Sequence, residues 1–340
     1  MSSNLPSRMR ALVVKNHHGG ALALELVEVP IPVPAAGEVL IRVAYAPLNP
    51  NDLLALRDAY DVKKPVGSVA GFEGSGRVVG GSGLMPRFLH GRRVAFASSP
   101  GGGSWAEFTT ASAMQCLPLR AGVDDVQGAT LLTNPITATV LLQQARSEGH
   151  RALVQAAAAG ALGTMMARLA PVLGMTMIHV VRSEEQVAML RGHGVEHVVD
   201  SSKPDWETEL TALCRRFQAT LALDPVGGAM SGTLLRALDI GGVVRVYGWL
   251  SGAPGVFDPN ELVFRRKRIE GFTMYDWVKR TSRLRQFVTA MRAQGLLHGP
   301  LATHVRTRAP LGDYASAFTD NERSMSGGKI LFSPASTTSS

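Results

Sequence analysis

The fold is decided by Ala152–Gly174, which reads ALVQAAAAGALGTMMARLAPVLG. Its opening residues form a short apolar run, as expected for a strand that is buried on both faces. The loop after this strand has small residues at the three glycine positions of a G-x-G-x-x-G template, namely Ala158, Gly160 and Gly163. A helix that begins near Ala161 directs free N–H groups and the positive end of its dipole at a bound phosphate. The stretch therefore predicts a strand, a phosphate-binding loop and a helix.

Small residues between a strand and a helix occur in many folds, so this motif needs support from the next strand. That strand is expected at 176–181, and it ends at Arg182 and Ser183. In a dinucleotide-binding sheet, an acidic residue at this position holds the ribose 2′-hydroxyl, whereas a cation suits a 2′-phosphate. Arg182 therefore favours NADPH, although Glu184 and Glu185 lie close enough in sequence to leave NADH open. The residues expected to contact the cofactor in these two loops are Ala158, Ala159, Gly160, Ala161, Leu162, Gly163, Arg182 and Ser183.

At 340 residues, the chain is long enough for about two domains, each with its own core. Hydrophobic residues make up 45% and charged residues 18%, which is typical of a globular protein. There is no apolar run of membrane-spanning length, and residues 1–6 lack the apolar core of a signal peptide. The two cysteines, Cys116 and Cys214, are too few for a disulfide framework or a four-cysteine zinc site. We therefore expect a cytoplasmic protein without a membrane partner.

The net charge of +8 allows three interpretations. Basic residues gather at 265–268 and 279–285, which is compatible with nucleic-acid binding, with a solvated helix face, or with attraction of an acidic ligand. Neither aromatic interleaving nor zinc-finger spacing accompanies these residues, so we expect no nucleic-acid partner. An acidic ligand would be a dinucleotide, a coenzyme A thioester or an acidic carrier protein.

The two halves of the chain differ in pattern. Short, glycine-rich strand patterns before residue 129 indicate an irregular, barrel-like β domain. Strand and helix patterns alternate from residue 130 onward, which predicts a doubly wound parallel sheet. The strands of this sheet are expected at 152–157, 176–181, 195–199, 219–223, 242–248 and 269–274. The helices are expected at 130–145, 161–173, 184–192, 205–217, 229–238 and 279–294.

An irregular β domain, a dinucleotide-binding domain and a final return segment together resemble the medium-chain dehydrogenase/reductase superfamily. The motifs that carry this resemblance are GFEGSGRV at 71–78, GRRV at 91–94, GSWAEF at 103–108, DPVGG at 224–228 and GKIL at 328–331. The resemblance implies an α/β fold, in which a Rossmann doubly wound parallel sheet joins a β-rich, GroES-like barrel domain. The expected division is 1–129 for the first part of the catalytic domain, 130–270 for the NADP-binding domain, 271–334 for the return segment, and 335–340 for a disordered tail.

The chain departs from the zinc-dependent members of this superfamily. Those members carry a Gly-His-Glu motif whose histidine binds zinc, and Phe72 stands at that position here. Their zinc-binding cysteine falls where this chain has Asn49-Pro-Asn-Asp52, and its histidines and cysteines form no cluster at zinc spacing. The resemblance therefore implies a zinc-independent enzyme without a metal site.

Among zinc-free members, the chain is most similar to the mitochondrial type of 2-enoyl thioester reductase, with quinone oxidoreductases next. Asn49-Pro-Asn-Asp followed by Tyr60 is similar to that family's Asn-Pro-Ser-Asp followed by its catalytic tyrosine. Asn134 and Thr137 match its Asn-Pro-x-Thr-Ala motif. The other matching stretches are 180–182 and 271–274. Two departures are the alanine-rich phosphate loop and Ser183, where the family has aspartate.

The resemblance assigns roles to several of these residues. Tyr60 becomes the proton donor to the substrate, with a pocket-ordering or surface position as the alternative. Asn49 and Asn51 are expected to hydrogen-bond the nicotinamide ribose or the substrate, unless they only form a turn. Asn134 and Thr137 are expected at the nicotinamide end, unless they only cap a helix. The further cofactor contacts, on strand ends and the return segment, are expected from Tyr247, Gly248, Trp249, Phe272, Met274 and Lys329.

The expected function is an NADPH-dependent, zinc-independent reduction of an activated C=C bond in a 2-enoyl thioester or a related enone. The hydride goes to Cβ and the proton to Cα. Two alternatives stay open, which are an NADPH:quinone oxidoreductase and a non-enzymatic NADPH-binding protein with a crystallin-like or regulatory role. The expected partners are a small-molecule or acyl-thioester substrate, carried by coenzyme A or an acyl carrier protein, and a second copy of the chain in a homodimer.

Overall fold

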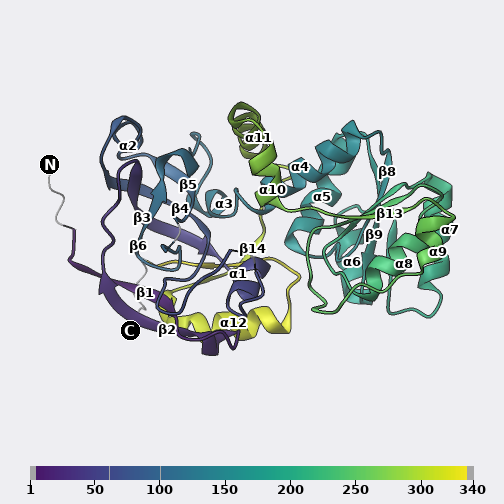
Figure 1. Ribbon diagram of the computed structural model, residues 1–340, viewed down its shortest axis with the longest axis horizontal. Helices are drawn as coiled ribbons and strands as arrows, with labels where there is room; N and C mark the ends of the chain where they lie inside the picture. Colours follow the sequence, from purple (N-terminus) through teal and green to yellow (C-terminus); the bar gives the residue numbers. More distant parts are fainter. Residues whose placement is uncertain (1–4, 61, 100, 335–340) are drawn as a thin grey trace. The chain divides into compact units, whose positions relative to one another are not determined.

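The computed structural model of the chain describes residues 5–60, 62–99 and 101–334. It divides into two compact units, which Figure 1 traces along the sequence. The first unit comprises Met1–Pro135, Ala293–His298 and Ala302–Ser340, and the second comprises Ile136–Arg292 and Gly299–Leu301. Residues 271–292 were expected in the return segment but belong to the second unit. The expected tail at 335–340 lies outside the described residues.

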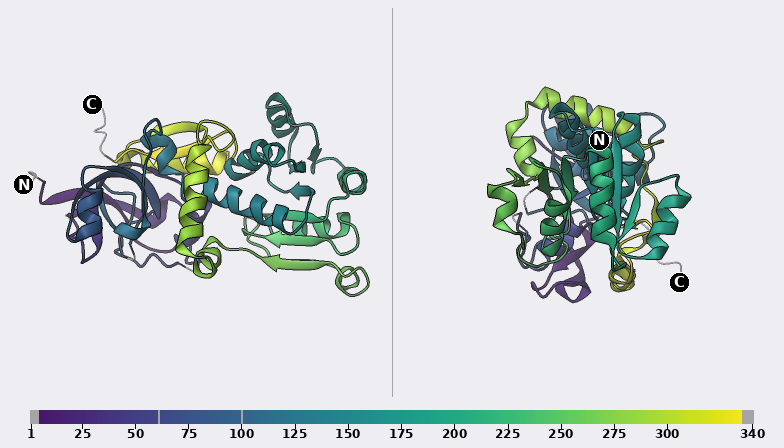
Figure 2. Two further views of the ribbon diagram at one scale, coloured as in Figure 1. Left: turned by 90° about the horizontal axis from the view of Figure 1, so that it is seen from above. Right: turned by 90° about the vertical axis from the view of Figure 1, so that its right-hand side faces the viewer.

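The second unit contains a parallel sheet of six strands. In chain order, they are β8 (Ala152–Gln155), β9 (Thr176–Val181), β10 (Val198–Asp200), β11 (Leu221–Asp224), β12 (Val243–Val246) and β13 (Arg268–Gly271). Their order across the sheet is β10-β9-β8-β11-β12-β13, and each neighbouring pair is parallel. The order reverses between β8 and β11, so the sheet is doubly wound, as the alternating pattern predicted. Strands of this sheet run side by side in the left view of Figure 2.

Helices cover both faces of this sheet. Those that lie wholly or mainly in the second unit are α4 (Asn134–Ser147), α5 (Ala161–Val172), α6 (Glu184–Gly192), α7 (Trp206–Phe217), α8 (Ala229–Ala237), α9 (Pro259–Val263), α10 (Met274–Arg280) and α11 (Arg283–Gly295). Val198 lies in one hydrophobic cluster with Leu190 of α6, and its neighbour Val199 lies in another with Leu210 of α7. Because successive strand residues point to opposite faces, α6 and α7 cover different faces. No described helix is both long and apolar enough to cross a membrane.

The first unit is the β-rich domain that the resemblance implied. Its sheet has seven strands, which are β3 (Glu38–Pro47), β4 (Glu73–Gly81), β5 (Arg93–Ala97), β6 (Phe108–Ser112), β7 (Cys116–Pro118), β14 (Val305–Ala309) and β15 (Lys329–Phe332). The order is β14-β15-β3-β4-β5-β7, and β6 pairs with β3. A separate hairpin joins β1 (Arg8–Val14) and β2 (Leu24–Pro30). The α-helices of this unit are α1 (Pro50–Ala55), α2 (Leu84–Leu89), α3 (Asp125–Ala129) and α12 (Tyr314–Arg323).

The core of the first unit surrounds the fully buried Trp105. Its ring meets the rings of Phe318 and Phe332 edge to face, with centroids 5.8 and 5.1 Å apart. Its indole N–H donates to the Pro47 carbonyl oxygen over 3.1 Å. Phe318 belongs to α12 and Phe332 to β15, so the C-terminal segment completes a core that the N-terminal strands begin.

Several expected boundaries differ from the structure. The strand expected at 152–157 ends at Gln155, where the phosphate loop begins. The strand expected at 269–274 ends at Gly271, and Met274 is the first residue of α10. The helix expected at 130–145 begins only at Asn134, after a turn at 130–133, and continues to Ser147 as α4. These differences arise where a loop at a strand or helix end keeps the apolar character of the neighbouring element.

Candidate active site

The carboxyl ends of the six parallel strands meet at one edge of the second unit's sheet. The phosphate loop follows β8, Arg182 and Ser183 lie at the end of β9, and residues 247–249 follow β12. Phe272 follows β13, and Met274 begins the next helix. Dinucleotides bind at this edge in doubly wound sheets. The structure therefore brings these predicted residues to one side of the second unit.

The phosphate loop lets the backbone come close to a phosphate. Gly160 precedes α5, a helix of 12 residues, whose first N–H groups have no partner within the helix. The loop side chains are no larger than methyl groups, and Ala158 and Ala159 are buried. Ala157 has φ +48°, a left-handed conformation that is costly for any residue with a Cβ. These features fit a dinucleotide pyrophosphate at the start of α5.

Gly163 sets the spacing between α5 and the phosphate loop. A Cβ here would lie 2.5 Å from the Ala158 carbonyl oxygen and 2.7 Å from its Cα, so Gly163→Ala must displace the loop backbone. We expect the unfolding free energy to fall by about 1–3 kcal/mol, measured by urea unfolding, together with weaker dinucleotide binding in a fluorescence titration. Gly192→Ala at the end of α6, where a Cβ meets nothing within 4 Å, is the matched control. Equal effects of the two variants would contradict this account.

Arg182 is exposed beside the N-terminus of α6. Its backbone N–H donates to the Gln186 side chain over 3.1 Å, and Ser183 caps α6 by accepting from the Gln186 N–H. Among the described residues, none forms an ion pair with the Arg182 guanidinium. The nearby Glu184 pairs instead with Lys203 at 3.2 Å. The guanidinium is thus available to an anion such as a 2′-phosphate.

Polar contacts and close backbone packing hold the loop after β12. Tyr247 Oη accepts a 2.8 Å hydrogen bond from the buried side chain of Gln155, the last residue of β8. A Cβ on Gly248 would lie 2.7 Å from the Pro225 carbonyl oxygen, so only glycine fits there. Trp249 is exposed, and its indole N–H donates to a carbonyl oxygen of the same loop over 2.7 Å. Contact of these residues with a cofactor stays a prediction.

Asp224, which was not predicted as a site residue, organises the neighbouring loop. Its buried carboxylate accepts hydrogen bonds from the Val226 and Gly227 N–H groups over 2.8 and 3.1 Å, and from the Ser231 hydroxyl over 2.6 Å. These bonds fix the turn between β11 and α8 at the carboxyl edge. An aspartate at a strand end followed by two glycines is a turn signal that could have identified this role.

The first unit holds a buried network of charged and amide side chains. Glu73 accepts hydrogen bonds from the Asn49 side-chain amide over 2.8 Å and from the Thr133 N–H over 3.0 Å. Lys329 donates to Asn49 Oδ1 and, over 3.4 Å, to the Leu48 carbonyl oxygen. Asn49 thus bridges Glu73 and Lys329, and all three side chains are buried.

This network differs from the roles that were expected. Asn49 and Lys329 were expected to contact ligands, yet their polar atoms bind each other and Glu73. Glu73 was not expected in the site at all. An acidic residue inside the otherwise small and apolar GFEGSG stretch was the available signal, because a buried carboxylate needs a partner. Direct ligand contacts of Asn49 and Lys329 stay predictions.

Asp52 lies beside the network, in the first turn of α1. One carboxylate oxygen accepts a 2.8 Å hydrogen bond from the Asn49 N–H, and the other is buried without a hydrogen-bond partner among the described residues. Burial, assisted by the negative charge of Glu73, raises the pKa of Asp52 to about 7. Burial also lowers the pKa of Lys64 and the pKa of Lys329, each to about 8. This part of the first unit therefore titrates near neutral pH.

Asp52→Asn should remove the free-energy cost of burying an ionised carboxylate, a cost that grows as the pH rises. Because the pKa of Asp52 is about 7 in the folded chain and ordinarily 3.8, the folded chain binds more protons between these values, and its unfolding free energy falls as the pH rises through them. Asparagine keeps an acceptor for the Asn49 N–H and buries no charge. The quantity to follow is the unfolding free energy of the variant minus that of the wild type. We expect this difference to increase by roughly 2–4 kcal/mol as the pH is raised from about 4 to 7. Urea unfolding at several pH values measures this, and a constant difference would rule it out.

Tyr60 and Lys64 contact the same aromatic ring. The half-buried Tyr60 meets Phe72 edge to face with centroids 5.7 Å apart, and the Lys64 ammonium lies 4.8 Å from the Phe72 ring centre. Lys64 also donates to the Gly102 carbonyl oxygen. Because Phe72 directly precedes Glu73 in the chain, the predicted proton donor lies close to the buried network.

Three further predicted residues lie near the beginnings of helices. Asn51 is half-buried in the first turn of α1. Asn134 is the first residue of α4 and Thr137 follows in the same turn, and both are buried. Pro135 is compatible with this position, because the first N–H groups of a helix need no partner within it. Contacts of these side chains with nicotinamide or substrate stay predictions.

Among the described residues, no three or more His, Cys, Asp or Glu side chains lie together in a way that could hold a metal ion. The Phe72 side chain has no donor atom for a metal. The two cysteines are free and buried, Cys116 in the first unit and Cys214 in the second.

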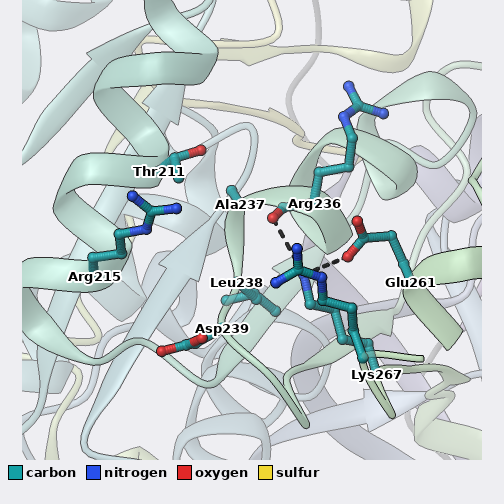
Figure 3. A pocket seen from close by; sticks show the side chains of 9 residues that line it. Thr211, Arg215, Arg236, Ala237, Leu238, Asp239, Glu261 and Lys267 are labelled. Atoms are coloured by element: carbon teal, nitrogen blue, oxygen red, sulfur yellow. Dashed lines mark hydrogen bonds and ion pairs between the residues drawn. The ribbon is translucent and has the colours of Figure 1, made fainter.

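A small hollow lies at the opposite, amino edge of the second unit's sheet. It measures about 100 Å³ and is lined mainly by charged residues near the C-terminal ends of α7 and α8. The buried Lys267 ammonium donates to the Leu235 and Arg236 carbonyl oxygens over 2.8 and 3.2 Å and pairs with Glu261 at 2.6 Å. Figure 3 shows the contacts of Lys267 with Arg236 and Glu261. Lys267 thus caps α8, and the hollow is explained by helix capping.

A doubly wound sheet with a phosphate loop at its carboxyl edge, joined to a β-rich domain, defines a class of dinucleotide-binding proteins. Two family models match the chain. The alcohol dehydrogenase GroES-like domain matches residues 35–121, and the zinc-binding dehydrogenase domain matches residues 161–292. The two matches fall in the β-rich and dinucleotide-binding parts of the chain.

Individual relatives match most of the chain. It is 29% identical over 325 residues to the mitochondrial enoyl-[acyl-carrier-protein] reductase of Xenopus tropicalis, covering 92% of each chain. It is 30% identical over 275 residues to a Caenorhabditis elegans protein of the same name, covering 79% of this chain and 78% of the other. A Mesorhizobium loti structure, provisionally called an NADPH:quinone reductase, has a TM-score of 0.91 at 32% identity and covers 98% of this chain and 100% of its own. The chain therefore belongs to the medium-chain dehydrogenase/reductase superfamily of oxidoreductases, in its enoyl reductase-like and quinone oxidoreductase-like part.

Proposed function

We propose that this protein is an NADPH-dependent, zinc-independent reductase of the C=C bond in 2-enoyl thioesters. The observation that carries the proposal is the carboxyl edge of the second unit, where a loop that fits a pyrophosphate is followed by the exposed Arg182. The names of the relatives that match most of the chain, enoyl-[acyl-carrier-protein] reductases, support the reaction. A reductase of this kind needs a hydride source, a proton donor and a group that stabilises charge on the thioester oxygen.

In this proposal, residues of the second unit bind the cofactor and select NADPH. The N–H groups at the start of α5 hold the pyrophosphate, and the small side chains of the loop let it come close. The Arg182 guanidinium binds the 2′-phosphate through charge-assisted hydrogen bonds, which favours NADPH over NADH. When bound, the cofactor supplies the hydride that is added to Cβ.

Arg182→Ala should weaken NADPH binding far more than NADH binding. One lost charge-assisted contact corresponds to about 1.5–3 kcal/mol, or roughly 10- to 150-fold in the NADPH dissociation constant. NADH lacks the 2′-phosphate, so its dissociation constant should change little. Isothermal titration calorimetry with both cofactors measures this. Arg191→Ala, at the exposed far end of α6, is the matched control, and an equal loss for both cofactors would remove the argument for NADPH.

The residues of the first unit account for proton transfer and charge stabilisation. Tyr60 donates the proton at Cα, because a phenol becomes an effective acid toward an enolate as basicity develops there. Asn49 is held by Glu73 and Lys329, so Asn51 on the same turn is the better donor to the thioester oxygen. The buried network positions this turn for the reaction.

The reaction in this proposal uses no metal. Phe72 replaces the metal-binding histidine of zinc-dependent relatives, and Asn49-Pro-Asn-Asp52 contains no thiol. Elemental analysis of purified protein should find far less than one zinc per chain, and dialysis against a chelator should leave the activity intact. Stoichiometric zinc that activity requires would contradict the proposal.

The decisive assay compares NADPH oxidation with crotonyl-CoA and with a naphthoquinone. The proposal requires turnover of crotonyl-CoA. Fast turnover of the quinone with none of crotonyl-CoA would favour an NADPH:quinone oxidoreductase, the alternative that the Mesorhizobium loti structure supports. Tight NADPH binding without turnover of either substrate would favour a non-enzymatic, cofactor-binding role.

A homodimer is part of the proposal. β13 lies at an edge of the six-stranded sheet, so its outer N–H and C=O groups lack a neighbouring strand within that sheet. Such an edge can pair with the same edge of a second copy. Sedimentation velocity should give twice the monomer mass, and a monomer at micromolar concentration would contradict this assembly.

A further inference from the structure

Helix α11 carries an apolar stripe on its outer face. Leu284, Phe287 and Val288 are spaced three and four residues apart, so they share one side of the helix. Leu284 is 73% and Phe287 54% exposed. Thr289 and Ala290 lie on the other side and are buried. The stripe is therefore separate from the packed face of α11, and packing within the protein does not explain it.

Helix α10 extends this apolar surface. Its Tyr275 and Val278 are also exposed. The side-chain amide of Gln286 donates to the Val278 and Thr281 carbonyl oxygens, each over 2.7 Å, and so ties the second turn of α11 to the end of α10. Figure 1 shows the two helices next to each other. We call Tyr275, Val278, Leu284, Phe287 and Val288 together the α10–α11 surface.

Cations surround the α10–α11 surface. The five exposed cations of the two helices are Lys279, Arg280, Arg283, Arg285 and Arg292. Asp276 is the only acidic residue in the sequence 274–292. None of these groups forms an ion pair with another described residue, although the Lys279 ammonium lies 4.2 Å from the centre of the Tyr275 ring. The surface thus combines exposed apolar area with positive charge that nothing in the described structure neutralises.

The α10–α11 surface begins at the carboxyl edge of the sheet. β13 ends at Gly271, and only Phe272 and Thr273 separate it from α10. The phosphate loop lies at the same edge, because it follows the parallel strand β8. A macromolecule seated on this surface would therefore lie at the edge where the dinucleotide binds.

We propose that the α10–α11 surface is the docking site for an acidic acyl carrier protein that delivers the enoyl thioester, an inference that rests on the proposed function. The apolar stripe would bury against an apolar patch of the carrier, and the cations would attract and orient its carboxylates. A second copy of this chain is a poor occupant, because it would bring five more cations to the same surface. A free coenzyme A thioester would pair its phosphates with the cations, but it has no apolar patch to cover the stripe, because its acyl chain lies in the active site during the reaction.

The test uses the double variant Arg283→Glu/Arg285→Glu and the single variant Phe287→Ser in the full-length protein. Fluorescence anisotropy with a labelled crotonyl-acyl carrier protein measures docking without turnover. We expect each variant to raise the dissociation constant at least about tenfold. Added salt should weaken binding to the wild-type protein much more than to the charge-reversed double variant.

Kinetics separate docking from chemistry. The catalytic efficiency for the crotonyl-acyl carrier protein should fall by about tenfold or more in both variants. The efficiency for the crotonyl thioester of N-acetylcysteamine, which has no carrier to dock, should stay within about twofold. If neither thioester is reduced by the wild-type protein, the proposed function fails, whereas the anisotropy measurement still decides whether the surface binds the carrier.

A matched control tests whether the effect is local. Arg265→Glu/Arg266→Glu changes the net charge equally, but these exposed residues precede β13 and so lie at the amino edge of the sheet. An equal loss of carrier binding in this variant would show general charge attraction and overturn the proposal. Unchanged binding in the α11 variants would overturn it too, as would a changed oligomeric state of Phe287→Ser in light scattering, which would make the surface a contact between copies.

Discussion

Lys329→Met should lower the unfolding free energy by about 3–5 kcal/mol at neutral pH, because it removes one partner from a buried set of opposite charges. Asn49 Oδ1 and the Leu48 carbonyl oxygen lose their shared donor. The buried Glu73 carboxylate also loses the nearby cation. Methionine replaces most of the aliphatic stem, so the change in packing is small. Urea unfolding at fixed ionic strength measures the loss.

A double-mutant cycle separates the charge effect from packing. Glu73→Gln in the Lys329→Met background removes the uncompensated charge and keeps one of the two acceptor oxygens that Asn49 and Thr133 use. The double variant should therefore be more stable than the sum of the two single losses implies. Strict additivity would mean that Glu73 and Lys329 do not act on each other, and the network as described would be wrong.

Tyr60→Phe should lower kcat for crotonyl-CoA by about 100-fold, the lower end of what a positioned general acid contributes. The phenylalanine ring keeps the edge-to-face contact with Phe72, so the fold and the NADPH dissociation constant should change little. Stopped-flow measurement of NADPH oxidation follows the chemical step directly. An unchanged kcat would show that another group, such as water, donates the proton.

Tyr45→Phe is the control for loss of a phenol elsewhere in the first unit. Tyr45 lies on β3, where the Arg308 guanidinium is 5.7 Å from its ring centre. Phenylalanine preserves that contact, so the activity and stability of this variant should match those of the wild type. A similar loss of kcat in Tyr45→Phe would point to a general effect on the first unit instead of proton donation by Tyr60.

Much of the dinucleotide-binding unit could be predicted from local pattern. The alternation of strands and helices, the small residues at 158–161 and 163, and the cation at 182 are all properties of short stretches. Parallel strands then bring their carboxyl ends together by geometry alone. The boundaries were less accurate, because apolar residues such as Phe272 and Met274 continue past the strand end into the next loop and helix.

The buried network could not be predicted in the same way. Lys329 and Asn49 are separated by 280 positions, so no local pattern shows that they meet. From the sequence, Lys329 could equally well be solvated, and Asn49 could equally well only form a turn. The same limit applies to α11, whose periodicity indicates an amphipathic helix without showing that an apolar stripe also faces outward. In both cases, burial is a property of the packed chain.

The placement of the two thiols has a chemical consequence under the proposed function, whose substrates are electrophiles. Enoyl thioesters and quinones both alkylate thiolates, and only the thiolate form of cysteine attacks readily. Burial raises the pKa of Cys116 and the pKa of Cys214, each to about 12, so both stay protonated at physiological pH. The chain has no other cysteine. A reductase built this way can work among Michael acceptors without being inactivated through its own sulfur atoms.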